Sequence, residues 1–164
     1  MAPKIEARPL VAEDEALIRA WIAEPEVRAW WGDAASAEAA IAIALTSATA
    51  VTRIMTADGR PFGYGHAVDD GIPGHAGRRS GLGAWRIDAF IGDAAFRGRG
   101  YGPAILDAMA LEVFATTLAL AVSVIVPLRH ERVARAAERA GFTWSEIVQE
   151  PGLGRCWLML RDRP

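Results

Sequence analysis

The sequence is poor in cysteine and histidine. Its 164 residues hold one cysteine, Cys156, and three histidines, which excludes a disulfide framework and any multi-cysteine metal site. The histidines have no metal-ligand spacing, so we expect no bound metal. The apolar neighbours of Cys156 favour a buried structural thiol on a strand over a nucleophile.

The sequence also lacks a basic excess and long apolar runs. A net charge of −2 and a pI near 5.9 argue against nucleic-acid binding, which normally requires a basic face. No uncharged stretch is long enough to cross a bilayer, and residues 1–6 lack the apolar core of a signal peptide. We therefore expect a cytoplasmic protein without nucleic-acid or membrane partners. The length predicts one domain, residues 1–164.

Two common phosphate-binding loops are missing as well. A Walker loop needs Gly-Lys followed by Ser or Thr, but the single lysine is Lys4. The dinucleotide fingerprint Gly-x-Gly-x-x-Gly fails at its last position, because counting from Gly98 and from Gly100 gives Pro103 and Ile105. Neither of these loops can hold a nucleotide in this protein.

A different glycine-rich loop is present between a strand-like and a helix-like segment. Glycines let successive backbone N–H groups turn toward an anion, and the helix that follows adds the positive end of its dipole. The loop therefore predicts a pyrophosphate site, although a tight turn with solvated arginines would need the same residues. Its members are Arg97, Gly98, Arg99, Gly100, Tyr101 and Gly102.

Apolar spacing and turn residues predict an α+β order of elements. The polar, glycine-rich residues 69–83 predict a long loop, of a kind that is often functional. The expected elements are a strand at 5–10, helices at 12–23, at 25–32 and from Ser36, a hairpin of strands 49–57 and 61–68, a strand at 84–91, a helix opened by Pro103, a strand at 118–126, a helix at 129–140, and a closing hairpin of strands 142–148 and 155–160.

Three segments together resemble the acetyl-CoA signature of the GNAT N-acetyltransferases. They are the strand Ile87-Asp88-Ala89-Phe90-Ile91, the loop 97–102, and Ala140-Gly141-Phe142 about forty residues later. The predicted order of elements follows the same family along essentially the whole chain. The resemblance implies a mixed, mostly antiparallel sheet with splayed central strands and flanking helices.

Within this family the chain is similar to the aminoglycoside 6′-N-acetyltransferase group. The likeness rests on Trp30-Trp31-Gly32, Phe62-Gly63-Tyr64, Ile87-Asp88 and the glycine loop. It implies that an amine attacks acetyl-CoA directly in a ternary complex. It also implies that the backbone of Phe90 and Ile91 pairs with pantetheine and that the N–H groups of residues 98–102 hold the pyrophosphate.

The resemblance makes Asp88 the catalytic candidate, because its position matches the acceptor-side aspartate of the group. An isolated aspartate is a weak base, so Asp88 would bind and orient the ammonium while water removes the proton. An ion pair with Arg86 or contact with a helix end is the alternative. Trp30, Trp31 and Trp85 would complete an aromatic acceptor pocket, with core packing as the alternative for the first two.

Two positions depart from the family pattern. His130 stands where an asparagine contacts CoA, and we assign it to the cofactor site because it can still donate a hydrogen bond. Ala137 stands where many members carry the tyrosine that protonates the leaving thiolate. The thiolate acid is therefore missing from its usual place.

The acceptor itself is left open. The loop before the fourth strand carries Arg78 and Arg79 where the aminoglycoside group is acidic, so an amino acid or a siderophore-precursor amine is an alternative to an aminoglycoside. A protein N-terminus or lysine is a further alternative, and a non-catalytic acyl-CoA-binding module is one of another class. The oligomeric state is also open, a homodimer included.

Overall fold

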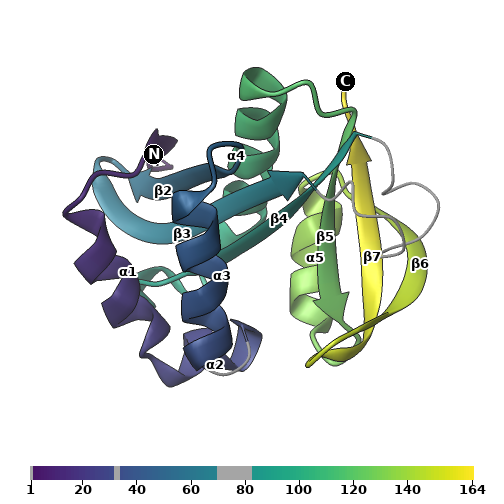
Figure 1. The fold of residues 1–164 in the computed structure, drawn as a ribbon, viewed down its shortest axis with the longest axis horizontal. Helices are drawn as coiled ribbons and strands as arrows, with labels where there is room; N and C mark the ends of the chain where they lie inside the picture. The colour runs from purple at the N-terminus through teal and green to yellow at the C-terminus, as the bar shows by residue number, and fades with distance from the viewer. Residues whose placement is uncertain (1, 32–33, 70–82) are drawn as a thin grey trace.

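A seven-stranded sheet organises the computed structural model, which describes residues 2–31, 34–69 and 83–164, without the side chains of residues 30, 31, 34–37 and 40 (Figure 1). The strand order is β1-β2-β3-β4-β5-β7-β6, and every neighbouring pair is antiparallel except β4 with β5. The predicted α+β class with a mostly antiparallel sheet is confirmed. The strands are β1 (Ile5–Pro9), β2 (Val51–Ala57), β3 (Arg60–Asp69), β4 (Ala84–Ile91), β5 (Ala121–Pro127), β6 (Thr143–Glu150) and β7 (Gly154–Asp162).

Helices cover the two faces of the sheet unequally (Figure 1). One face carries α4 (Tyr101–Thr116) and α5 (Glu131–Arg139), with a 3₁₀ turn η1 (Ala94–Phe96) before α4. On the other face, the helices α1 (Asp14–Ile22), α2 (Pro25–Trp31) and α3 (Ala34–Thr46) lie against the half made by β2, β3 and β4. No helix in the described part of the chain is both long and apolar enough to cross a membrane.

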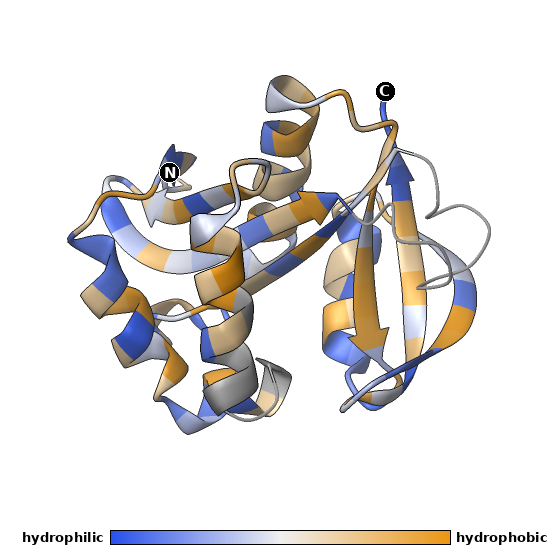
Figure 2. Ribbon diagram, viewed as in Figure 1, coloured by the Kyte–Doolittle hydropathy of each residue, from blue (hydrophilic) through white to orange (hydrophobic). Residues whose placement is uncertain are grey.

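Each helical layer has its own apolar core. Apolar residues at three- and four-residue spacing on α4 are buried against the sheet, with Met109 and Val113 fully enclosed. On the other side, Trp21 of α1 meets Phe90 of β4 edge to face, at 6.2 Å between ring centroids. Figure 2 shows β5 as a nearly continuous apolar strand, as expected for a strand whose side chains are covered on both faces.

Several element boundaries differ from those predicted. The apolar run from Leu118 does not enter a strand until Ala121, and Leu118 is 95% exposed. The reason is that Thr117 closes α4, so the next residues form a link between helix and strand. Ser36 lies inside α3 and does not precede it. Most of the long loop expected at 69–83 falls outside the described residues.

The two central strands diverge. β4 and β5 pair only from Ala84 with Ala121 to Arg86 with Ser123. Beyond that point, the rest of β4 pairs only with β3, and the rest of β5 pairs with β7. The sheet therefore has the splay that the resemblance implied, and Arg86 and Ser123 mark its apex.

Candidate active site

The glycine loop lies between η1 and α4, at the end of β4 that has left β5. Gly98 and Gly100 have φ values of +70° and +83°, a conformation that glycine adopts at little cost. A Cβ added to either residue would meet no atom within 4 Å. This side of the loop is therefore open, and its backbone can be approached closely.

The start of α4 has free hydrogen-bond donors. The first N–H groups of a helix have no partner within the helix, and no side chain caps α4 at Gly100. The dipole of a 16-residue helix adds positive potential at the same place. The loop and the helix start together can hold an anion such as a pyrophosphate.

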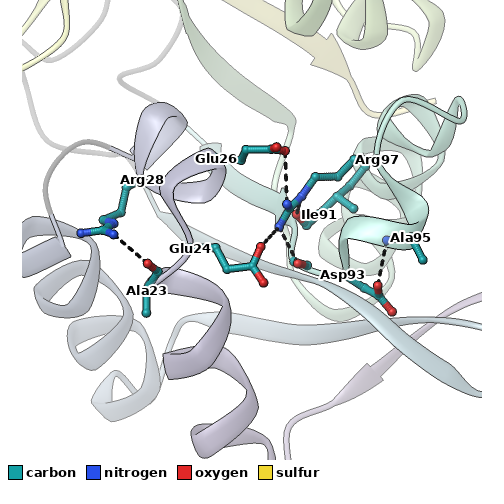
Figure 3. Close-up of polar contacts among 9 residues, drawn as sticks. Ala23, Glu24, Glu26, Arg28, Ile91, Asp93, Ala95 and Arg97 are labelled. Carbon is teal, nitrogen blue, oxygen red and sulfur yellow. Dashed lines mark hydrogen bonds and ion pairs between the residues drawn. The ribbon is translucent and has the colours of Figure 1, made fainter.

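The two arginines of the loop have different surroundings. Arg97 donates to the carbonyl oxygens of Ile91 (3.2 Å) and Gly92 (2.6 Å), and its guanidinium also pairs with Glu24 (2.7 Å) and Glu26 (3.2 Å) (Figure 3). Its backbone N–H donates to the carbonyl of Ala94. The interpretation of Arg97 as a phosphate ligand is therefore not supported, because its donors tie the loop to β4 and to the N-terminal helices.

Arg99 is the arginine that stays available. It is exposed, and it forms no hydrogen bond or ion pair with any described residue. Arg99 and Arg97 are identical in type and two residues apart, so the sequence could not separate them. What separates them is the position of Glu24 and Glu26, more than seventy residues earlier in the chain.

Two further residues assigned to the cofactor have structural roles. A Cβ on Gly102 would lie 3.3 Å from the Cβ of Ala136, so this glycine allows α4 and α5 to pack closely. His130 is the N-cap residue of α5, and its N–H donates to the carbonyl of Pro127. Burial, with Arg129 nearby, lowers the pKa of His130, so its imidazole is neutral at pH 7. It lines an open hollow of about 370 Å³ formed by residues 128–132.

Asp88 lies on the face of β4 opposite to α4. Ile87 packs into the core with α4, whereas Phe90 packs against α1, so the alternation of the strand places Arg86 and Asp88 on the second face. His66 is the cross-strand partner of Asp88. The His66 Nε2 lies 3.5 Å from the Asp88 Oδ2, and its Nδ1 lies 3.0 Å from the hydroxyl of Tyr64.

Arg86 extends this cluster toward β6. Its Nε is 3.4 Å from the Asp88 Oδ2, and its Nη1 is 2.8 Å from the Glu150 Oε1. The Oε2 of Glu150 and the Oγ of Ser123 are buried and have no hydrogen-bond partner among the described residues. We call Tyr64, His66, Arg86, Asp88 and Glu150 the acceptor-face cluster.

The cluster carries an excess negative charge. Burial alone would raise the pKa of Asp88, but Arg86 and His66 outweigh it and lower the pKa from 3.8 to about 2. Asp88 is therefore ionised at neutral pH. Two carboxylates against one guanidinium leave one net negative charge when His66 is neutral. The site suits a cation better than an anion.

The ion pair with Arg86, foreseen as an alternative for Asp88, is present. It does not consume the carboxylate, because Arg86 and His66 both contact Oδ2 and no described residue donates to Oδ1. The Asp88 side chain keeps 31% of its surface exposed. Asp88 can therefore pair with Arg86 and still bind an amine.

The aromatic acceptor pocket needs correction. Trp85 lies three residues before Asp88 and packs against the core that contains α4, so it occupies the opposite face of β4 and cannot line a pocket with Asp88. α2 ends at Trp31. The side chains of Trp30 and Trp31, like Arg78 and Arg79 of the long loop, lie outside the described part of the chain.

Sequence reasoning missed His66 and Glu150. His66 follows Tyr64 by two residues on a predicted strand, so period-2 alternation places both on one face, and that signal was available. Glu150 had no local signal, because it reaches Arg86 from 64 residues away at the end of β6. The register of a non-local strand pairing decides that contact.

Cys156 occupies the predicted place. It is fully buried on β7. Burial, with the nearby Glu150, raises the pKa of the thiol, which keeps it protonated and unreactive at neutral pH. The expected burial of Cys156 on a strand is confirmed, and its lack of a catalytic role stays a prediction.

Comparison with known proteins places this geometry in a family. The model of an acetyltransferase (GNAT) domain matches residues 11–149. A search of curated protein sequences finds no significant match. Solved structures with the same fold are similar to this chain over nearly its whole length.

Three of these solved structures share the fold, although their sequences are only 12% to 21% identical to this chain. Aminoglycoside acetyltransferase AAC(6′)-Ib in complex with coenzyme A and kanamycin has a TM-score of 0.81 at 21% identity, covering 98% of this chain and 95% of that one. An aminoglycoside N(6′)-acetyltransferase from Legionella pneumophila has a TM-score of 0.77 at 19% identity, covering 99% and 94%. A spermidine N-acetyltransferase chimera that includes the Vibrio cholerae enzyme has a TM-score of 0.71 at 12% identity, covering 96% and 95%.

The family match covers most of the chain, and the splayed strands and the glycine loop at the start of α4 agree with it. The chain belongs to the GNAT acetyltransferase family.

Proposed function

We propose that this protein is an acetyl-CoA-dependent N-acetyltransferase that acetylates a cationic small-molecule amine by direct attack in a ternary complex. The observation that carries the proposal is the position of Asp88. It lies on β4, two residues past the apex of the splay, and no residue in the described part of the chain donates to its Oδ1. The glycine loop follows at the end of the same strand, so one strand connects the cofactor side with the acceptor side.

The cofactor is held mainly by backbone. The N–H groups of residues 98–102 and the guanidinium of Arg99 would bind the pyrophosphate. The backbone of Phe90 and Ile91, on the part of β4 that has left β5, would pair with pantetheine as an added strand does. An N–H of β4 would polarise the thioester carbonyl and stabilise the oxyanion. His130 at the start of α5 would add a neutral donor.

The acceptor amine is held by charge. Asp88 would accept a hydrogen bond from the ammonium through Oδ1 and orient it toward the thioester. A carboxyl with a pKa of about 2 is a poor base, so the amine loses its proton to water before it attacks. Burial, aided by Asp88, raises the pKa of Tyr64, which makes that hydroxyl a weak acid. Water therefore also protonates the thiolate.

An aminoglycoside is the first acceptor to test. Two of the solved structures above are aminoglycoside acetyltransferases, and one of them holds kanamycin. The net negative charge of the acceptor-face cluster fits such a polycation. An acceptor that carries its own carboxylate finds less support, because both ends of the Arg86 guanidinium already face carboxylates.

A thiol-release assay tests the proposal. Purified protein with acetyl-CoA would be offered kanamycin, spermidine, an amino acid panel and short peptides, and calorimetry would measure CoA binding separately. We expect CoA binding and turnover with at least one cationic small molecule. CoA binding without turnover of any amine would instead support an acyl-CoA-binding module, and turnover confined to peptides would move the acceptor to a protein N-terminus or lysine.

The cellular location and the oligomeric state stay predictions made from the sequence. A cytoplasmic location would give the enzyme its acetyl-CoA, and a homodimer is one of the assemblies that the sequence leaves open. Fractionation and light scattering would measure them.

A further inference from the structure

We propose that His66, held by the hydroxyl of Tyr64, is a positioning residue that turns Asp88 so that a single carboxylate oxygen, Oδ1, meets the acceptor amine. This inference rests on the proposed function, since it assigns a role within the same acceptor site. Neither the sequence motifs nor the family likeness pointed to His66.

The contacts form a continuous chain on one face of the sheet. Tyr64 and His66 are two residues apart on β3, and both are buried, with 0% and 3% of their surface exposed. Their rings meet edge to face at 5.6 Å. Tyr64 Oη lies 3.0 Å from His66 Nδ1, and His66 Nε2 lies 3.5 Å from Asp88 Oδ2. Tyr64 therefore contacts the imidazole at its Nδ1 side, and the Asp88 carboxylate faces its Nε2 side.

The ionised carboxylate decides which nitrogen of His66 carries the hydrogen. Nε2 faces Asp88, which is negative at neutral pH, so a bare nitrogen lone pair there would be repelled. An imidazole that carries one hydrogen therefore places it on Nε2, where it faces Asp88. Nδ1 is then the acceptor, and the Tyr64 hydroxyl donates to it.

This arrangement makes His66 a donor and not a general base. A base would need a free lone pair directed at the reacting amine, but Nε2 carries a hydrogen and Nδ1 is occupied by Tyr64. The two nitrogens that face Asp88, Nε2 of His66 at 3.5 Å and Nε of Arg86 at 3.4 Å, both lie nearest to Oδ2. Oδ1 is left for the substrate. In the described part of the chain, the remaining carboxylate of the cluster is Glu150 on β6, and the thiol of Cys156 on β7 lies beside it.

Nitrogen NMR of the imidazole rings tests the arrangement without any turnover. The chain has only three histidines, so the His66 signals can be assigned by their loss in His66→Gln. We expect Nε2 of His66 to carry a hydrogen in the wild-type protein. An Nδ1–H tautomer would overturn the proposal, because His66 could not then donate to Asp88.

Kinetics with two substitutions test the role. His66→Phe keeps an aromatic ring but removes both nitrogens, and we expect kcat/KM for the acceptor to fall about 10-fold, mainly through KM, with an unchanged Kd for CoA. His66→Gln keeps a donor near the position of Nε2 and should recover most of the loss. Val113→Ala, a cavity in α4 away from the site, is the control that loses stability with both kinetic constants unchanged.

Each other outcome contradicts the proposal in a recognisable way. Equal kcat/KM in His66→Phe and wild type would remove the role, and a matching loss in CoA affinity would make it merely structural. A limb of the pH profile near ~6.5 that disappears in His66→Gln would make His66 the base. A wild-type protein that acetylates no amine would instead fail the proposed function, while the nitrogen spectra would still judge the Tyr64–His66–Asp88 chain.

Discussion

The cofactor side and the acceptor side of this site are built in different ways. The cofactor side is a run of consecutive residues, 98–102, whose open backbone and helix start can hold an anion such as a pyrophosphate. The acceptor side is a set of side chains from β3, β4 and β6 that hold one another through hydrogen bonds and ion pairs. One side depends on main-chain conformation, and the other depends on strand register.

This difference separates what each side can tolerate. Glycines with positive φ cannot be replaced without strain, but the identity of most neighbouring side chains matters little to a backbone donor. In the acceptor-face cluster, removal of one member leaves a buried polar partner unsatisfied. The following substitutions test whether the two sides fail independently.

The largest effect is expected from Gly100→Val. A branched side chain with φ near +83° would stand over the loop where the pyrophosphate binds, and loss of one or two charge-assisted hydrogen bonds should weaken CoA binding about 100-fold or more. Gly152→Val is the matched control, because Gly152 has φ +79° and equally open surroundings in the β6–β7 turn. Calorimetry that shows the same CoA affinity in both variants would remove the loop from the cofactor site.

The next effect is expected from Asp88→Asn. The substitution keeps the size of the side chain but removes its charge, so kcat/KM for the acceptor should fall about 100-fold with CoA affinity nearly unchanged. Asp162→Asn, an exposed residue on β7, controls for the loss of a charge. If Asp88→Asn instead weakened CoA binding and spared turnover, the two sides of the site would not be separable.

Acid should act on the acceptor side. The pKa of Asp88 lies at about 2 in the folded protein and near 3.8 in the unfolded chain, so its contribution to the free energy of unfolding is present above pH 4 and lost as the pH falls toward 2. We expect wild type to lose roughly 2 kcal/mol more than Asp88→Asn over this range in urea titrations. Asp14, whose pKa is lowered by Arg8, titrates in both proteins and cancels. Parallel acid curves would contradict the charge assignment.

A smaller effect separates the two arginines of the loop. Arg99→Ala should weaken CoA binding about 10-fold without a change in Tm, because it removes one charge-assisted hydrogen bond to the ligand and no described residue pairs with Arg99. Arg97→Ala should instead lower Tm, because the carbonyls of Ile91 and Gly92 and the carboxylate of Glu24 lose their donor. Calorimetry would measure CoA binding and thermal melts would measure Tm. A lower Tm in Arg99→Ala, or weaker CoA binding in Arg97→Ala at an unchanged Tm, would contradict these assignments.

The smallest effect is expected from Cys156→Ala. The thiol is buried beside the acceptor-face cluster but has no role in it, so activity should stay within about twofold while stability falls by roughly 1 kcal/mol. Turnover and urea denaturation measure the two quantities. A folded but inactive variant would indicate a covalent step on sulfur.

Local patterns made much of the fold and the cofactor side predictable. Met109 and Val113, which are four residues apart, are both buried on one face of α4, as helical periodicity requires. Gly98 and Gly100 indicated a loop with an accessible backbone before a helix, and both have positive φ. Even the error at Trp85 was avoidable, since a strand places residues three apart on opposite faces. These features depend on neighbours within a few positions.

The remaining contacts depend on residues that are far apart in the sequence. Asp88 meets His66 only because β3 and β4 pair in one register, and a shift by one residue would turn His66 to the other face. Glu150 reaches Arg86 across β5 and β7. These partners are too far apart in the sequence for a local pattern to connect them. The net charge of the acceptor-face cluster could therefore be read only from the structure.

The four contacts of Arg97 have a practical consequence for engineering. Exchanging α1 and α2 for those of another family member, in order to change which amine is accepted, would also remove Glu24 and Glu26 from the loop that precedes α4. A chimera without these two carboxylates would free the Arg97 guanidinium and weaken the packing of the pyrophosphate loop. A change meant to alter amine specificity would then appear as weaker binding of acetyl-CoA. Chimeras of this protein should therefore carry both glutamates across the splice.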